Sequence, residues 1–214
     1  PMERLFRDED YDFLAAQPSR SATLGKRLRV ARRRIFRQYL RCLSRDFDRV
    51  VNEVVALAPD VVIADCTTPT LADDLEFAAR VKRLLPECLI LFYGTHAAAR
   101  PEDVVVGAVD CAIIGEPEET AAEVCRVVGC GKRDALQQVA GLALRDQNGQ
   151  VKRTVPRPPP GNLDLLPAPA REFLDNRRYR LAYNGKPFTI VQTARGCSFR
   201  CIFCTAPLFS PGVR

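Results

Sequence analysis

Short apolar runs alternate with helical patterns in the middle of the sequence, and this alternation constrains the fold more than any other feature. Three runs have the length and the continuous apolar character of buried parallel strands, and they lie at residues 60–65, 88–93 and 109–114. Helical patterns follow each of them, at residues 71–85, 102–106 and 118–128. This order predicts an α/β fold built on a doubly wound parallel sheet of the Rossmann-like kind.

The loops after the three predicted strands carry the candidate cofactor-binding residues. Carboxyl ends of parallel strands share one edge of a sheet, and ligands bind at that edge. The candidates are Thr67, Thr68, Gly94, Thr95, His96, Gly115 and Glu116. Each loop also has a structural interpretation, because threonines cap helices, glycine ends strands, and proline with acids suits a first helical turn. The residues alone leave both interpretations open.

Three cysteines, Cys197, Cys201 and Cys204, form a CxxxCxxC run. Three thiolates on one short loop can ligate three irons of a 4Fe-4S cluster and leave the fourth iron open for chemistry. Ferredoxin runs are spaced differently and supply a fourth cysteine, which disfavours simple electron carriage. A structural zinc site needs four ligands, and the single histidine lies a hundred residues upstream. We therefore assign the three cysteines as candidate iron ligands.

The remaining cysteines are scattered singly through apolar stretches. They are interpreted as small buried hydrophobic residues, namely Cys42, Cys66, Cys88, Cys111, Cys125 and Cys130. A total of nine is odd, and nothing resembles a secretory signal, which argues against a disulfide framework. These features predict a reducing compartment, the cytoplasm.

The first part of the sequence is strongly basic. Eleven Lys or Arg residues lie between Arg20 and Arg49 and explain most of the net charge of +6. Apolar residues recur there every three or four positions as far as Pro59, which predicts one or two long helices. Such a helix suits peripheral contact with anionic lipid, or a solvated face that touches an acidic surface elsewhere in the protein. Nucleic acid is the less favoured partner.

The run from Thr189 through the three cysteines to Pro207 resembles the first strand and cluster loop of radical S-adenosylmethionine (radical SAM) enzymes. The resemblance implies that the cysteines hold a 4Fe-4S cluster and that S-adenosylmethionine chelates the fourth iron. Reductive cleavage then yields a 5′-deoxyadenosyl radical. Phe203 would pack on the adenine of this cofactor, and its alternative is a core phenylalanine. A small-molecule substrate and an electron donor such as flavodoxin or ferredoxin are also implied.

Upstream motifs resemble those of the radical SAM group that carries a cobalamin-binding domain. Two of them look like that group's motifs at the carboxyl edge of the sheet, which is called the rim below. They are Gly94-Thr95-His96-Ala97-Ala98 with Arg100-Pro101-Glu102-Asp103, and Gly115-Glu116-Pro117-Glu118-Glu119-Thr120. An alternating segment around Asn148-Gly149 predicts a β-hairpin, and the proline-rich residues 156–169 look like the group's linker. The Asp-x-His-x-x-Gly motif that supplies a cobalt ligand is absent. His96 is therefore expected near the corrin rather than on the metal.

These features divide the chain into four segments. They are a basic helical segment (1–44), a cobalamin-binding-like domain (45–135), a hairpin with a proline-rich linker (136–180), and the first strand and cluster loop of a radical SAM barrel (181–214). A complete barrel needs ~200 residues. We therefore expect a fragment of a longer enzyme, inactive alone, that serves methyl transfer or rearrangement of an unknown substrate.

Two other functions remain open. A radical SAM methylthiotransferase that acts on transfer RNA also has a leading α/β domain, with its own cluster cysteines. Of the possible ligands for that second cluster, Cys66, Cys111, Cys125 and Cys130 lie in predicted strand and helix interiors rather than in loops, which argues against it, while Gly129-Cys130-Gly131 argues for it. A non-catalytic corrinoid or iron–sulfur module that docks on a partner is the other, and it predicts a stop codon after Arg214.

Overall fold

The computed structural model describes residues 7–16, 21–181, 184–199, 201–204 and 212–213. Thr205, Ala206 and Pro207, which end the predicted cluster-loop motif, lie outside the described residues. The chain separates into two compact units, residues 1–57 and residues 58–214.

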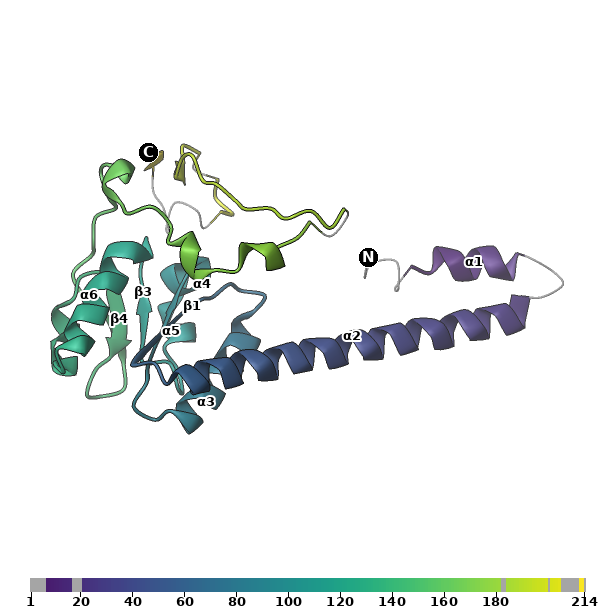
Figure 1. Ribbon diagram of the computed structural model, residues 1–214, viewed down its shortest axis with the longest axis horizontal. Coiled ribbons are helices and arrows are strands. Elements are labelled where there is room, and N and C mark those ends of the chain that lie inside the picture. The colour runs from purple at the N-terminus through teal and green to yellow at the C-terminus, as the bar shows by residue number, and fades with distance from the viewer. Residues whose placement is uncertain (1–6, 17–20, 182–183, 200, 205–211, 214) are drawn as a thin grey trace. The chain divides into compact units, whose positions relative to one another are not determined.

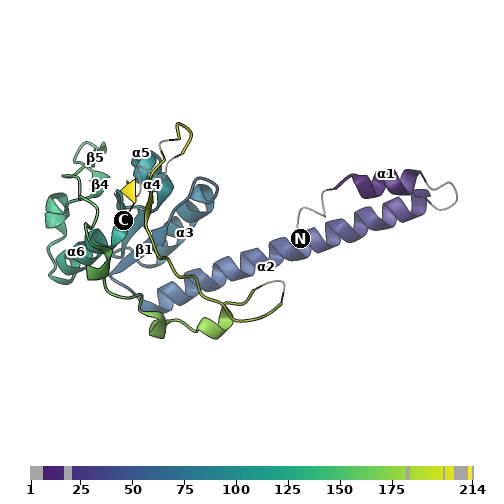
Figure 2. The ribbon, with the colours of Figure 1, turned by 90° about the horizontal axis from the view of Figure 1, so that it is seen from above.

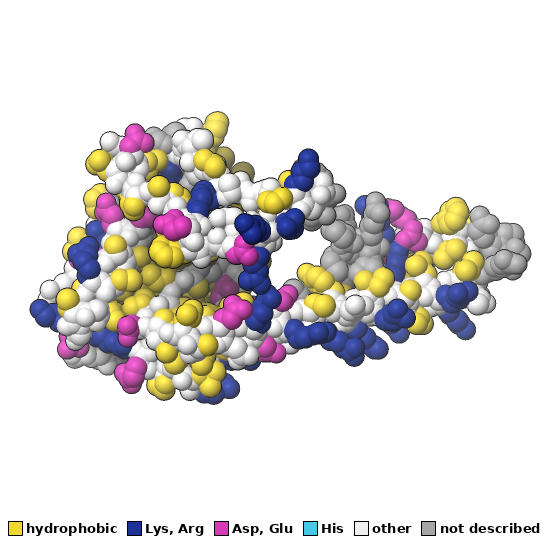
Figure 3. Space-filling view, viewed as in Figure 1, with side chains coloured by type: hydrophobic (Ala, Val, Ile, Leu, Met, Phe, Trp, Pro, Cys, Tyr) yellow, Lys and Arg dark blue, Asp and Glu magenta, His cyan; other side chains and the backbone are white. Residues whose placement is uncertain are grey.

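The first unit contains two helices that lie side by side, α1 (Glu9–Ala15) and α2 (Ser21–Leu57) (Figures 1 and 2). The 37 residues of α2 agree with the expected long helix. Arg32 fastens the pair, because its guanidinium lies 4.9 Å from the ring centroid of Tyr11 and forms an ion pair with Asp10. Lys and Arg side chains line one edge of α2, and hydrophobic side chains gather on the edge toward α1 (Figure 3). This unit is therefore an amphipathic, basic helical hairpin.

None of the helices in the described ranges combines the length and the apolar character that a membrane span requires.

The second unit is built on a five-stranded sheet in the order β1-β2-β3-β4-β5. Three strands run parallel, β1 (Val61–Asp65), β2 (Leu89–Tyr93) and β3 (Cys111–Ile113). β4 (Leu142–Arg145) and β5 (Val151–Arg153) are antiparallel additions beside β3. The parallel strands and the β-hairpin are confirmed. The sheet is nevertheless mixed, because the hairpin joins it instead of standing apart.

Helices connect and cover the parallel strands, and a helix follows each strand as predicted. They are α3 (Leu71–Leu84), α4 (Thr95–Ala99), α5 (Pro101–Val104) and α6 (Pro117–Gly129). α4 is an addition, because residues 94–98 were expected to form a loop. Leu91 and Ile113 pack on one face of the sheet with Val124 of α6, whereas Ile90 and Phe92 point to the opposite face and are also fully buried. Burial on both faces explains why the strands appear in the sequence as continuous apolar runs.

A polar network closes the β4–β5 hairpin. Asp146 accepts hydrogen bonds of 2.9 Å from the backbone N–H groups of Asn148 and Gln150, and it pairs with Lys152 at 2.7 Å. The hydrogen bond from Lys152, followed by those from the backbone, lowers the pKa of the Asp146 carboxyl. Gly149 has a φ of +77°, a left-handed conformation that glycine adopts without strain. The Asn-Gly pair in the sequence therefore marks the turn as predicted.

The segment after the hairpin contains little regular structure. Short 3-10 helices lie at η2 (Arg133–Gln138) before the hairpin and at η3 (Leu163–Leu165), η4 (Arg171–Phe173) and η5 (Asn176–Arg178) after it. Residues 189–194, the predicted first strand of a barrel, do not form a strand. A parallel barrel strand needs neighbouring strands to accept and donate its backbone hydrogen bonds. The two-residue strands β6 (Gly196–Cys197) and β7 (Gly212–Val213) pair instead.

The prediction that the six scattered cysteines are buried is correct for three of them and wrong for the other three. Cys66, Cys88 and Cys111 are buried as predicted, but Cys42, Cys125 and Cys130 are exposed. The last three lie on helices or at a helix end, where apolar neighbours in sequence face in different directions from one another. Burial raises the pKa of the Cys66 thiol to about 12, with a further contribution from the charge of Asp74, and it raises the pKa of Cys111 to about 12.

Thiol alkylation should separate these two classes. Because the thiolate is the reactive form, Cys66 and Cys111 should stay unmodified by iodoacetamide at pH 8, while Cys125, Cys130 and Cys201 react. We expect a difference in rate of at least about 100-fold, since a pKa near 12 leaves only a minute thiolate fraction. Peptide mass spectrometry of the native apoprotein measures it. Rapid labelling of Cys66 without unfolding would contradict the burial described here.

Candidate functional site

Loops from β1 and β2 meet at the carboxyl edge of the sheet through Thr68 and His96. Thr68 Oγ1 lies 2.9 Å from His96 Nδ1, so the two predicted rim loops are joined by a hydrogen bond. The His96 side chain is only 10% exposed, and Asp103 Oδ2 lies 3.7 Å from its Nε2. Within the described residues His96 Nε2 is buried and has no hydrogen-bond partner. A buried nitrogen of this kind favours a polar ligand atom at the rim.

Thr67 takes part in a local network instead. Its backbone N–H donates to Thr70 Oγ1 at 3.2 Å, and Thr70 Oγ1 donates to Asp74 Oδ2 at 2.7 Å. These bonds fasten the loop to the first turn of α3. The structural interpretation of these threonines was helix capping, but Thr70, the N-cap residue of α3, makes no side-chain cap hydrogen bond. Its hydroxyl joins Thr67 and Asp74 in a local turn network instead.

Gly94 marks a close approach between the first two strand ends. Its φ is +113°, and a Cβ there would lie 2.2 Å from Asp65 Oδ1 and 2.7 Å from the backbone oxygen of Cys66. Only glycine fits such a place without displacing the neighbouring chain. Thr95, the next residue, is exposed at the start of α4. The rim at this point is thus shaped by the backbone, and the exposed Thr95 lies at its surface.

The third rim loop places acidic side chains at the start of α6. Gly115 has a φ of +87°, and Glu116 is the N-cap residue of α6 with a side chain only 3% exposed. Arg195 reaches this acid pair from the cysteine loop: its NH1 lies 3.0 Å from Glu116 Oε2 and 2.8 Å from Glu118 Oε1. The segment that carries the three cysteines is therefore ion-paired to the rim.

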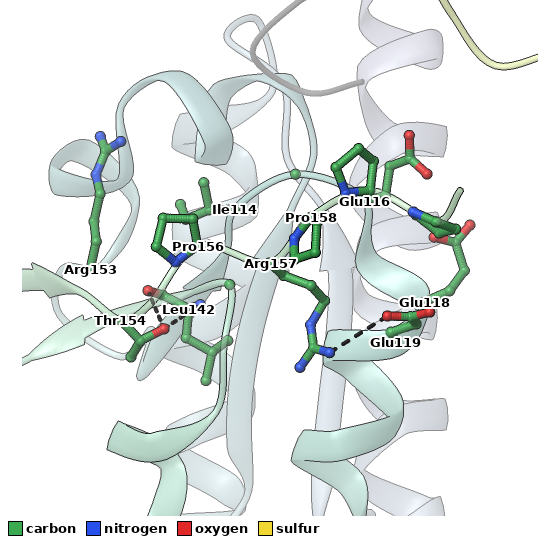
Figure 4. Close-up of a pocket in the computed structure, with 14 residues that line it drawn as sticks. Ile114, Glu116, Glu118, Glu119, Leu142, Arg153, Thr154, Pro156, Arg157 and Pro158 are labelled. Atoms are coloured by element: carbon green, nitrogen blue, oxygen red, sulfur yellow. Dashed lines mark hydrogen bonds and ion pairs between the residues drawn. The ribbon is translucent and has the colours of Figure 1, made fainter. Parts of the chain in front are cut away.

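A cavity of about 310 Å³ lies beside the same helix terminus (Figure 4). It is bounded by the Gly115 loop, the strand β4 and the proline-rich linker. Arg157 of the linker reaches toward Glu119, with 3.6 Å between NH1 and Oε2, and its Nε donates to Thr120 Oγ1 at 2.8 Å. Drug-sized ligands already fill cavities of about 300–1,000 Å³, and a corrinoid is larger. This cavity is therefore a joint between linker and domain and not a corrinoid pocket.

The three predicted iron ligands lie on an open loop. Cys197 is partly exposed, and Cys201 and Cys204 are exposed. In the part of the chain that the structure describes, no three His, Cys, Asp or Glu side chains are close enough to hold a metal ion. The thiols are thus adjacent in sequence but are not brought together. Phe203 is 88% exposed, so the alternative of a core phenylalanine is wrong for this structure.

The site contains residues to which sequence reasoning gave no role. Arg195, Arg157 and Asp103 make its polar contacts, and Glu118 shares the guanidinium of Arg195. Arg195, Asp103 and Glu118 lie inside the sequence motifs described above, and Arg157 lies in the proline-rich linker. The acids at the start of α6 are explained by the helix dipole alone, so no sequence signal indicated their arginine partners.

The residue types present suit both cofactors that the sequence resemblance implies, although the described residues do not bring the three thiols together. A glycine that keeps the strand ends close together suits a large ligand lying across the rim. His96 Nε2 suits a polar ligand too, because it is buried and makes no hydrogen bond within the described residues, with Asp103 Oδ2 3.7 Å away. Three thiol donors on one short loop have the chemistry that an iron–sulfur cluster requires.

Comparison with protein families gives a match to the B12 binding domain over residues 27–125. An uncharacterized methyltransferase of Pyrococcus horikoshii is 29% identical over 164 residues, which cover 76% of this chain and 35% of that protein. The hopanoid C-3 methylase of Methylococcus capsulatus is 29% identical over 165 residues, which cover 74% of this chain and 30% of that protein. The chain thus spans about a third of the length of these relatives.

A solved structure shares the fold. The radical S-adenosylmethionine methyltransferase TsrM of Kitasatospora setae, with cobalamin and a [4Fe-4S] cluster bound, superposes with a TM-score of 0.56 at 17% identity. The match covers 78% of this chain and 35% of that one. The Rossmann-like fold predicted from the alternating strands and helices is therefore confirmed. The chain is therefore similar to a B12 binding domain over residues 27–125, and its fold is that of a methyltransferase structure with cobalamin bound.

Proposed function

We propose that the loops after β1, β2 and β3 bind cobalamin and that Cys197, Cys201 and Cys204 hold a 4Fe-4S cluster chelated by S-adenosylmethionine. One observation carries the proposal: a B12-binding domain match and a CxxxCxxC run occur in the same chain. The whole protein would then act by methyl transfer on a small molecule, with rearrangement as the second reaction class. Two relatives named as a methyltransferase and a methylase support the first class.

Each group of residues has a defined task in this proposal. The bound cofactors supply a reducing electron and a methyl group, and the chain holds them in place. The exposed thiols of Cys201 and Cys204 are accessible to iron, and Phe203 beside them presents an open aromatic face for the adenine of S-adenosylmethionine. At the rim, Thr68 fixes the ring of His96 through Nδ1. Nε2 makes no hydrogen bond within the described residues and lies 3.7 Å from Asp103 Oδ2, so a polar group of the corrinoid would bond to it beside that carboxylate.

A methylthiotransferase would need a second set of iron ligands in the sheet domain. Of the four candidates, Cys66 and Cys111 are buried, and burial raises their pKa to about 12. Iron is ligated by the thiolate, so thiols that stay protonated are poor ligands. Cys125 and Cys130 remain on the surface, too few for a cluster. The single-cluster function is therefore the better supported one.

Anaerobic reconstitution with iron, sulfide and hydroxocobalamin tests the proposal on the full chain. We expect about four irons and one corrinoid per chain, and a change in the electron paramagnetic resonance (EPR) spectrum of the reduced cluster when S-adenosylmethionine is added. About eight irons would support the methylthiotransferase, and corrinoid without iron would support a non-catalytic corrinoid module. Retention of neither cofactor, or tight binding of zinc, would overturn both assignments.

A further inference from the structure

Two arginines that are distant in sequence end on the first two turns of α6. Arg157 comes from the linker and pairs with Glu119 and Glu123. Arg195 comes from the cysteine loop and pairs with Glu116, 79 residues away in the chain, and with Glu118. The amino end of α6 therefore receives both the linker and the loop that follows it.

The contact of Arg195 has the features of a strong ion pair. Its side chain is 21% exposed and that of Glu116 is 3% exposed, so water screens the pair far less than it screens surface pairs. Two carboxylates share one guanidinium nitrogen at 3.0 and 2.8 Å. Removing Arg195 would take a cation away from the almost fully buried carboxylate of Glu116, which costs stability. The pair should therefore hold the loop in place rather than form by chance.

The position of Arg195 ties this contact to the first iron ligand. Cys197 follows after one residue, so the two Cα atoms can be at most about 7 Å apart. The intervening Gly196 has a φ of +91°, a turn that restricts the path between them. α6 itself begins just after β3, at the carboxyl edge of the sheet. Anchoring Arg195 therefore keeps Cys197 beside that edge.

We propose that Arg195 is a positioning residue that, through Glu116 and Glu118, holds the cysteine loop against the cobalamin-binding edge of the sheet. This role of Arg195 rests on the function proposed above, because the contact would set where the cluster lies relative to the corrinoid. The contact itself belongs to the protein alone. It can therefore be measured before either cofactor is added.

Hydrogen–deuterium exchange of the cofactor-free full chain tests the contact. In Arg195→Gln, amides in residues 191–199 should exchange roughly tenfold faster than in the unaltered protein, because a charge-assisted bond to a buried acid is lost. Arg195→Lys keeps the charge but not the forked geometry of the guanidinium, so its loop amides should exchange at a rate between those of Arg195→Gln and the unaltered protein. The exchange of β2 and β3 should not change. That pattern distinguishes a released loop from a loosened domain.

Two further variants control for folding and for charge. Glu116→Gln combined with Arg195→Gln removes both charges of this ion pair, and its loop should exchange no faster than that of Arg195→Gln alone. Arg153→Gln removes an exposed pair with Glu102 at 3.6 Å and should leave the loop unchanged. Equal loop exchange in Arg195→Gln and the unaltered protein, with both folded, would overturn the proposal.

A second measurement uses reconstituted protein. Arg195→Gln should retain its iron and corrinoid while the magnetic interaction between the reduced cluster and cob(II)alamin weakens in EPR spectra. If the unaltered protein binds no iron but the exchange difference persists, the proposed function fails and the loop contact stands. If cofactors bind and their interaction is the same in both proteins, the positioning role fails.

Discussion

Replacing Cys201 by alanine is expected to abolish iron binding, from about four irons per chain to nearly none after anaerobic reconstitution. Cys201 is the middle ligand of the CxxxCxxC run, and two remaining thiolates on a loop cannot hold a cubane cluster. The brown colour and the visible absorbance should disappear with the iron. Iron analysis and absorption spectra of the reconstituted protein measure the effect.

The matched control is Cys130→Ala. Cys130 is also an exposed cysteine, but it lies after α6 and outside the cysteine loop. This variant should bind as much iron as the unaltered chain. If Cys201→Ala keeps its iron, or if both variants lose it equally, the ligand assignment is wrong.

Substitution of Gly94 by alanine should lower the free energy of unfolding by about 2–4 kcal/mol. The new Cβ would lie 2.7 Å from a backbone oxygen of Cys66, which no side-chain rotation can relieve, and the φ of +113° is unfavourable for alanine. Urea denaturation measures the loss. Because the displaced atoms form the rim, corrinoid binding should weaken in the same variant even where it remains folded.

Gly107→Ala is the control that separates the cost of a positive φ from the cost of a steric clash with the neighbouring backbone. Gly107 also has a positive φ, +53°, but a Cβ there would meet nothing within 4 Å. Gly107→Ala should lower the free energy of unfolding by about 1 kcal/mol, the cost of the left-handed conformation alone. If the two substitutions cost the same, the close approach of the strand ends at Gly94 is not as described.

The strands of the sheet were predictable because their signal is local. Runs such as Leu89–Tyr93 are buried on both faces and so stay apolar at every position. The Asn-Gly turn of the hairpin was equally clear. That β4 pairs with β3 was not, because antiparallel pairing across 29 residues leaves no local mark (Ile113 opposite Leu142).

The polar contacts of the site were less predictable than its location. Order along the chain placed Thr68, His96 and Glu116 at strand ends, and all three lie at the rim. The partners of Glu116 and Glu118 were not foreseeable, because charge pairing between distant segments depends on the path of the linker. The strand predicted at residues 189–194 is not formed. The sequence pattern there suits a strand, but a strand also needs neighbouring strands with which to form backbone hydrogen bonds.

The two outer strands of the sheet have unequal chemistry. β5 is three residues long and carries Lys152 and Arg153, charges that repel an approaching strand. β1 at the other end of the strand order is longer and reads Val-Val-Ile-Ala-Asp. Backbone donors and acceptors along an apolar border form a template for further pairing. Lateral growth of this sheet, by whatever polypeptide, is consequently favoured beside β1 and discouraged beside β5.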